Sequence, residues 1–152
     1  MSRTRMRFSI FIHFVIACSL LFAAGVASAA SAAHDRSGRA VDLGQEFKLK
    51  AGRQVAVKGT KLWIRFVGVS NDSRCPKDVQ CVWAGNAAVR LLVSAGRSRQ
   101  NLTLNTNKSP TLTTEAQFHD YNIKLIELSP YPRKGHKIAT RSYTATLLIS
   151  KE

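Results

Sequence analysis

Apolar and polar residues alternate along most of the chain after residue 45, and this period of two constrains the fold more than any other feature. Successive side chains of a β-strand point to opposite faces, so the alternation predicts strands with one buried face. It occurs in seven stretches bounded by turn-forming residues, namely 47–50, 55–57, 62–69, 87–93, 100–106, 121–125 and 143–149. No stretch repeats apolar residues with the helical spacing of i, i+3, i+4 and i+7 over three turns. The sequence therefore predicts an all-β fold.

We expect residues 45–152 to form a single antiparallel β-sandwich of about seven strands, immunoglobulin-like in architecture, with a small β-barrel as the alternative. The uneven lengths of the strands favour the sandwich. Three long connections, 70–81, 107–117 and 129–140, also favour it, because we expect them to cross between the two sheets. Residues 30–44 are small and polar and show no periodicity, which predicts a flexible N-terminal segment.

Residues 1–29 have the three parts of a secretory signal peptide. Three arginines near the N-terminus form a positive region, an apolar run extends from 8 to 26, and small residues follow. We expect cleavage after Ala29 or Ala32, which leaves a periplasmic or secreted protein without a transmembrane segment. An uncleaved membrane anchor is the alternative, because the apolar run is about long enough to span a bilayer, but the small residues at its end favour cleavage.

A second processing route is lipidation at Cys18. The sequence Val15-Ile16-Ala17-Cys18 resembles the box of bacterial lipoproteins, in which the cysteine is acylated and becomes the N-terminus. The residues that follow, 19–26, are apolar, so cleavage at this point would divide the apolar run. Lipid anchoring through Cys18 is therefore the alternative to release into the periplasm.

Two cysteines follow the predicted leader, Cys75 and Cys81, with five residues between them. In an exported protein such a pair predicts a disulfide, because the compartment is oxidising. A metal site is disfavoured, because the spacing is not C-x-x-C and no histidine lies between the two cysteines. We therefore expect a short loop closed by one disulfide.

Four residues around this disulfide are candidates for a binding loop: Asp72, Ser73, Arg74 and Trp83. A structural interpretation makes Asp72 and Ser73 accept hydrogen bonds within turns, pairs Arg74 with Asp72 or Asp78, and packs Trp83 on the disulfide. The functional interpretation makes the loop a recognition surface that the disulfide holds rigid, since binding residues concentrate on loops of rigid scaffolds. Both interpretations remain open from the sequence.

The string D-S-R-C-P-x4-C-x-W-A-G, from Asp72 to Gly85, resembles the signature of a family of uncharacterised small bacterial exported proteins and lipoproteins. The later segments 121–125 and 129–132 are also similar to that family. The resemblance extends over most of residues 45–150. It implies an origin in the bacterial envelope and a β-rich domain, and it implies no activity.

The chain is strongly basic, with a formal net charge of +14. Three of the 23 basic residues and none of the nine acidic ones precede the Ala29 cleavage point, so cleavage there leaves a net charge of +11. This charge favours an acidic protein, an anionic lipid or an anionic polysaccharide as partner; no nucleic acid is expected. Most basic residues are dispersed over predicted strands, which is typical of a solvated surface. The densest group, and the candidate anion-binding site, is Arg133, Lys134, His136, Lys137 and Arg141.

No catalytic or metal-binding motif is present in the sequence. Beyond the leader, the histidines are His34, His119 and His136, and none has a partner at i+2 or i+4. We therefore predict a non-enzymatic binding or interaction module of the bacterial cell envelope, without a cofactor. The alternatives are an inhibitor of an exported hydrolase that uses the Cys75–Cys81 loop, and a periplasmic metal-binding protein.

Overall fold

The computed structural model describes residues 40–152, which form nine β-strands and one turn of 3-10 helix. The predicted signal peptide, the lipidation candidate Cys18 and His34 lie outside the described residues. The elements are β1 (Ala40–Val41), β2 (Glu46–Lys50), β3 (Gln54–Val57), β4 (Leu62–Asp72), β5 (Ala87–Ala95), β6 (Ser98–Asn105), β7 (Glu115–Phe118), β8 (Tyr121–Ser129), η1 (Thr140–Ser142) and β9 (Thr144–Lys151).

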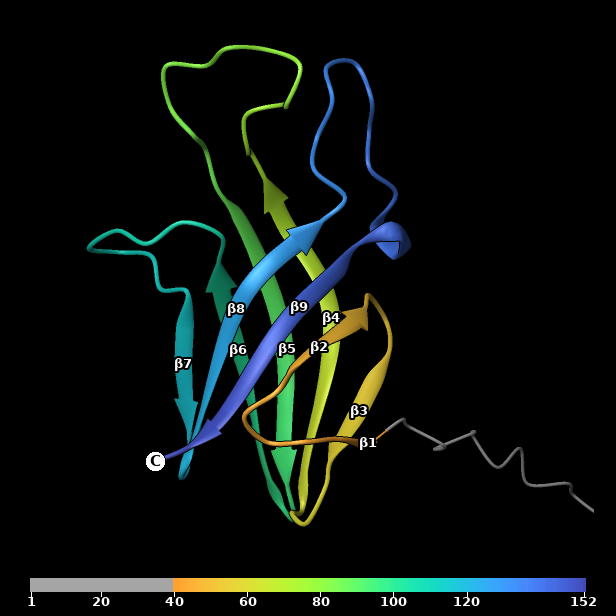
Figure 1. The fold of residues 1–152 in the computed structure, drawn as a ribbon, viewed down its shortest axis with the longest axis vertical. Coiled ribbons are helices and arrows are strands. Elements are labelled where there is room, and N and C mark those ends of the chain that lie inside the picture. The colour runs from red at the N-terminus through yellow and green to blue at the C-terminus, as the bar shows by residue number, and fades with distance from the viewer. Residues whose placement is uncertain (1–39) are drawn as a thin grey trace, which may run out of the picture. The chain divides into compact units, whose positions relative to one another are not determined.

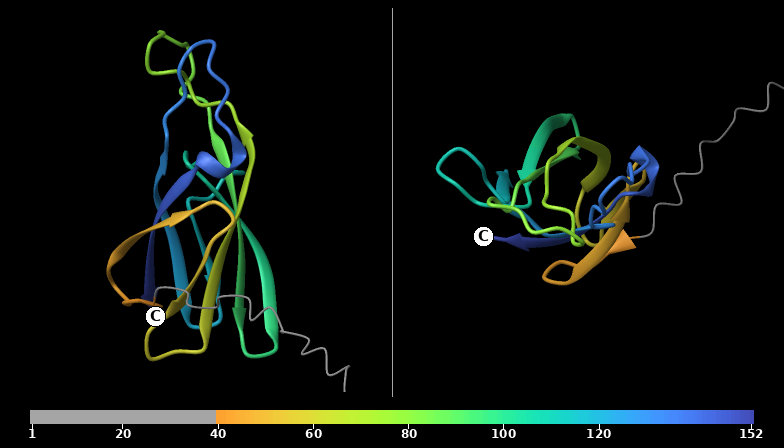
Figure 2. Two further views of the ribbon diagram at one scale, coloured as in Figure 1. Left: turned by 90° about the vertical axis from the view of Figure 1, so that its right-hand side faces the viewer. Right: turned by 90° about the horizontal axis from the view of Figure 1, so that it is seen from above.

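The strands form two sheets that pack face to face, with the orders β1-β3-β4-β5-β6 and β2-β9-β8-β7 (Figures 1 and 2). Neighbouring strands are antiparallel except for the short parallel pair of β1 and β3. The predicted β-sandwich is confirmed, and the sheets do not close into the alternative barrel.

The core lies between the sheets and follows the alternation of the sequence. In β4, for example, Leu62, Ile64 and Phe66 are fully buried, and Arg65 between them is exposed. The fully buried residues opposite come from β8 and β9 and include Ile123, Leu147 and Ile149. Burial of these apolar surfaces is the main force that holds the sheets together. The lysines and arginines that alternate with buried residues in the strands are exposed, as predicted for Lys48, Lys50, Arg65, Arg90 and Lys124.

All seven predicted strands are present, and two further ones were not predicted. β1 takes residues 40–41 of the segment predicted to be flexible, and pairs with Ala56 and Val57. β7 takes residues 115–118, of which the first three belong to the predicted loop 107–117. Its sequence Glu-Ala-Gln-Phe does alternate, but it has only four residues and adjoins a segment rich in Thr, Ser and Asn, which predicted a loop. Pairing with β8 holds it as a strand.

The prediction that three long connections cross between the sheets is wrong for two of them. Residues 73–86 join β4 to β5, and residues 130–143 join β8 to β9; in each case the two strands are antiparallel neighbours within one sheet. Of the three, only residues 106–114, between β6 and β7, cross from one sheet to the other. The strand directions place all three connections at one end of the sandwich, opposite the C-terminus (Figure 1). We call this the loop end.

A bulge in β8 shapes the base of the loop end. The register with β9 shifts between Leu125 and Glu127, so that Leu125 and Leu128 both point into the core although they are three residues apart. The extra residue leaves Ile126 and Glu127 exposed side by side. Bulges of this kind re-aim side chains near the ends of sheets.

Candidate functional site

The connection 73–86, here called the stapled loop, is closed by the predicted disulfide between Cys75 and Cys81, whose Cα atoms are 5.9 Å apart. Two main-chain hydrogen bonds extend the β4–β5 pairing into its base, from Ser73 N–H to Asn86 at 2.8 Å and from Cys75 N–H to Ala84 at 2.9 Å. The loop therefore stands on an extension of the sheet.

Gly85 makes this close pairing possible. Its φ is +69°, in the left-handed region, and a Cβ at this position would overlap the carbonyl oxygen of Ser73. Only glycine satisfies both conditions. The glycine of the W-A-G string therefore has a structural role. It allows the loop segment that carries Trp83 to pair closely with the segment that carries Arg74.

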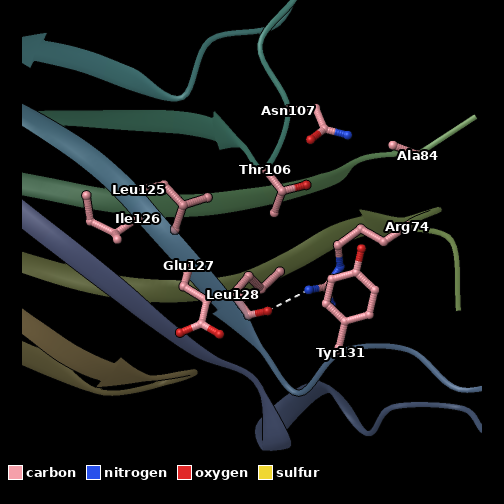
Figure 3. Close-up of a pocket in the computed structure, with 9 residues that line it drawn as sticks. All are labelled: Arg74, Ala84, Thr106, Asn107, Leu125, Ile126, Glu127, Leu128 and Tyr131. Carbon is pink, nitrogen blue, oxygen red and sulfur yellow. Dashed lines mark hydrogen bonds between the residues drawn. The ribbon is translucent and has the colours of Figure 1, made fainter. Parts of the chain in front are cut away.

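Arg74 is the buried centre of the loop end, with 5 % of its surface exposed. Its Nε and Nη2 donate to the two carboxylate oxygens of Asp72 at 2.8 and 2.7 Å. Its Nη1 donates to the Leu128 oxygen near the end of β8 at 2.5 Å (Figure 3). Its Nη2 also donates to the oxygen of Pro130, the first residue of the connection 130–143, at 2.9 Å. The guanidinium also lies over the ring of Tyr131, 4.9 Å from its centre. One side chain thus joins β4 to the end of β8.

Asp72 is held on both sides. Its Oδ1 accepts a hydrogen bond from the Arg74 N–H at 3.3 Å, which is the predicted turn, and its Oδ2 accepts one from the Tyr143 hydroxyl at 3.0 Å. Burial alone raises the pKa of the Asp72 carboxyl, but the hydrogen bonds from Arg74 and Tyr143 outweigh burial and leave that pKa below its ordinary value. Burial, reinforced by the bond to Asp72, raises the pKa of Tyr143 to about 12. The pair therefore carries a carboxylate and a neutral phenol at neutral pH.

The other predicted partners of the loop differ from the expectation. Arg74 pairs with Asp72 but not with Asp78, whose Oδ1 accepts a hydrogen bond from the Lys134 N–H at 2.8 Å. This bond, with further help from the nearby charges of Arg133 and His136, holds the pKa of Asp78 below its ordinary value. Ser73 bonds across the loop to the Asn86 oxygen at 3.0 Å rather than two residues ahead.

The connection 130–143, here called the basic loop, lies beside the stapled loop in all three views (Figures 1 and 2). Besides Arg74, two hydrogen bonds join them: Lys77 N–H donates to the Pro132 oxygen at 3.1 Å, and Lys134 N–H donates to Asp78. The structure therefore brings together two groups of candidate residues that the sequence places about 50 positions apart.

All five residues of the candidate anion site are exposed: Arg133, Lys134, His136, Lys137 and Arg141. None of them forms an ion pair with a carboxylate of residues 40–152, where the two ion pairs are Lys58–Asp42 and Arg74–Asp72. The two acidic residues of the stapled loop region, Asp72 and Asp78, are already engaged within the loop end. The single negative charge of Asp78 offsets only part of the charge of the basic loop, which presents net positive charge to solvent.

Trp83 does not pack on the disulfide, so that part of the structural interpretation is wrong. It is 81 % exposed, and its neighbour Val82 is 89 % exposed. Tyr131 and Ile126, at 49 % and 41 %, are also exposed at this end of the sandwich. A large apolar residue that remains exposed next to others of its kind is a mark of an interaction surface. The loop end therefore combines apolar side chains with positive charge.

A cavity of about 230 Å³ lies at the foot of the two loops (Figure 3). Its lining includes Leu125 and Ile126 from β8 beside the polar side chains of Glu127, Asn107 and Tyr131. The connection 106–114 closes one side, and its Asn107 donates a hydrogen bond to the oxygen of Gly85. Sequence reasoning missed Ile126, Glu127 and Asn107, although the three-residue spacing of Leu125 and Leu128 is a signal for the bulge that exposes the first two.

The two histidines among the described residues do not come together. His119 lies in the β7–β8 turn and His136 in the basic loop, on connections at opposite ends of the sandwich. Among residues 40–152, no group of three or more His, Cys, Asp or Glu side chains is placed to hold a metal ion. The same part of the chain contains no helix of the length and hydropathy needed to cross a membrane.

No protein family, curated protein or solved structure matched the chain. Functional inference therefore starts from the geometry of the loop end.

Proposed function

We propose that the protein is an exported, non-enzymatic binding module of the bacterial cell envelope, and that it contacts its partner through the loop end. The observation that carries this proposal is the exposure of Trp83, 81 %, on a loop that a disulfide closes. Tryptophan and arginine are the residues that most often dominate binding energy at interfaces. A folded protein gains nothing for its own stability from a tryptophan in this position, so the side chain is explained better by a partner.

The rigidity of the support favours the same conclusion. The stapled loop is fixed by the disulfide, by Gly85 and by the hydrogen bonds of Arg74. A surface that is already ordered loses less conformational freedom on binding, which strengthens the complex. A loop that binds nothing would not need to be ordered in this way.

Two features support an exported location. The N-terminal segment has the parts of a signal peptide, and the Cys75–Cys81 pair is bonded, as is typical of oxidising compartments. A lipid anchor at Cys18 keeps the module on the same side of the membrane. The resemblance to exported proteins and lipoproteins of bacteria supports the envelope as its location.

The proposal is tested by capture from the native envelope. The tagged protein, crosslinked in its own cells, should retain one partner component that the double variant V82A/W83A loses, with both proteins equally stable. Val67→Ala is the matched control, because Val67 is an exposed valine (40 %) of β4 outside the loop end, and it should capture like the wild type. Capture that is insensitive to V82A/W83A contradicts the proposal. So does turnover of envelope substrates that is lost when one polar residue is changed.

A second function is favoured by the position of Val82 and Trp83 directly after Cys81: inhibition of an exported hydrolase, with the stapled loop inserted into its cleft. The basic surface requires an acidic target, since opposite potentials speed and strengthen association. This alternative predicts a one-to-one complex that abolishes the hydrolase activity, and both effects should disappear in W83A. Hydrolase activities that are unchanged by an excess of the protein contradict it.

A further inference from the structure

We infer that the loop end docks on the surface of an anionic lipid bilayer, with Val82 and Trp83 entering the interface and the basic loop lying against the phosphates. This inference rests on the proposed function and specifies its partner. This end of the sandwich supplies both the apolar and the charged contacts that such a surface requires.

The apolar contact is made by two neighbouring side chains. Val82 and Trp83 are 89 % and 81 % exposed and belong to a loop that extends beyond the strands of both sheets (Figure 2). Tryptophan is enriched at membrane–water interfaces, because its large ring is apolar and its N–H remains hydrated. A valine beside it adds apolar surface without a polar group that would have to lose its water.

The charged contact is made by the basic loop and by Lys77 of the stapled loop. Lys77, Arg133, Lys134 and Lys137 are exposed and form no ion pair with a carboxylate in the described part of the chain. Asp78 accepts the hydrogen bond of the Lys134 N–H, and its single negative charge offsets only part of this positive charge. Clusters of four or more Lys and Arg beside apolar anchors are typical of surfaces that bind anionic lipids.

The two loops lie side by side at the same extremity, so one plane can contact both (Figures 1 and 2). Three ties hold them in this arrangement: the hydrogen bonds of Arg74 to the Leu128 and Pro130 oxygens, that of Lys77 N–H to Pro132, and that of Lys134 N–H to Asp78. Binding therefore needs no rearrangement of the loops.

A bilayer fits these features better than an acidic protein. The charges are on long, exposed side chains without buried hydrogen-bond partners, which suits a layer of mobile phosphates rather than a fixed set of carboxylates. A protein partner would have to supply a pocket for Trp83, whereas a bilayer accepts an exposed tryptophan without one.

The test uses the processed protein purified from its own envelope, with Trp63→Phe as the background so that Trp83 is the sole tryptophan. It is mixed with vesicles of phosphatidylcholine alone or of phosphatidylcholine with phosphatidylglycerol. We expect sedimentation with the anionic vesicles only, a shift of Trp83 emission to shorter wavelength, and weaker binding as ionic strength rises.

Variants locate the contact. R133A/K134A/K137A should lower the partition coefficient about 100-fold, because each Lys or Arg near an anionic surface contributes about fivefold. The matched control R65A/R90A/R99A removes the same charge from β4, β5 and β6, outside the loop end, and should change binding far less. V82A should weaken binding, and V67A should not.

Several results overturn the inference: no emission shift, equal binding to both kinds of vesicle, an equal loss in R65A/R90A/R99A, or binding to a soluble acidic polymer without binding to vesicles. The outcome is separable from that of the proposed function. If vesicles are not bound but Trp83-dependent capture of an envelope protein persists, only the lipid partner is wrong. If both are absent, the binding function of the loop end is wrong as well.

Discussion

The guanidinium of Arg74 donates a hydrogen bond to the main-chain oxygen of Leu128 across 54 positions of the sequence, at 2.5 Å. The same group binds the Asp72 carboxylate and the Pro130 oxygen. A single buried cation thus joins the stapled loop to the strand that leads into the basic loop. The integrity of the loop end and the stability of the sandwich are therefore coupled through Arg74.

Replacement of Arg74 by methionine should destabilise the protein by about 3–5 kcal/mol, because it leaves the buried Asp72 carboxylate without its partner. Arg74→Lys should cost less but still be destabilising, since an ammonium group cannot reproduce the planar fork of donors. Urea unfolding measures both changes. The control is Lys58→Ala, which removes the exposed ion pair with Asp42 and should cost less than about 1 kcal/mol. If Arg74→Met lowers the free energy of unfolding no more than Lys58→Ala does, Arg74 does not hold the loop end together.

The bond between Tyr143 and Asp72 predicts a loss of stability at alkaline pH. The pKa of Tyr143 is raised to about 12 from the ordinary 10.0, so the folded state holds the phenol proton more tightly than the unfolded chain does. The resulting stabilisation is complete below pH 10 and is lost as the pH rises toward 12. Tyr143→Phe should flatten the stability profile in this window, whereas Tyr131→Phe, which removes another phenol of the loop end, should not. An unchanged slope in Tyr143→Phe contradicts the prediction.

Gly85→Ala should disrupt the base of the stapled loop. The new methyl group meets the carbonyl oxygen of Ser73, which is part of the main chain and cannot yield. Gly135→Ala is the matched control, because Gly135 has nearly the same φ, +72° against +69°, and nothing within 4 Å of the added Cβ. We expect about 1 kcal/mol for the control, from backbone strain alone, and about 3 kcal/mol or more for Gly85→Ala. Thermal or urea unfolding decides, and equal losses exclude the steric argument.

Removal of the disulfide should affect binding more than folding. A ring this small constrains the unfolded chain little, so C75S/C81S should lower stability by roughly 2–2.5 kcal/mol. Both cysteines lie in the connection between β4 and β5 and outside the strands, so the circular dichroism of the sheets should be unchanged. Partner capture or vesicle binding should decrease, because Val82 and Trp83 lose their fixed support. Full binding in the folded double variant excludes the disulfide as a source of rigidity.

The sequence predicted the sandwich because each strand buries one face. Arg65 between Ile64 and Phe66 illustrates this: a charged residue placed between two core residues allows only one orientation of the strand. The Cys75–Cys81 disulfide and the Asp72–Arg74 pair were also predictable, since their members are close in sequence. Each of these features could be predicted because it depends on residues that are close to one another in the sequence.

Features that depend on the arrangement of the strands were not predictable in this way. The order of strands in the sheets is not encoded in the alternation, so two hairpin connections were expected to cross between the sheets. The contact of Arg74 with Leu128 and Pro130 requires two sheets to be assembled. The sequence left two roles open for Trp83, packing on the disulfide or facing a partner, and only the assembled structure shows that its side chain is exposed.

The anchoring of the stapled loop at its base has a consequence for protein engineering. Arg74, Gly85 and the main-chain bonds of Ser73 and Cys75 fix the base of the loop, and the side chains of residues 77, 79, 80, 82 and 83 are not part of the core. Those five positions are therefore suited to randomisation, with Asp78 retained for its bond to Lys134 and the sandwich serving as a display scaffold.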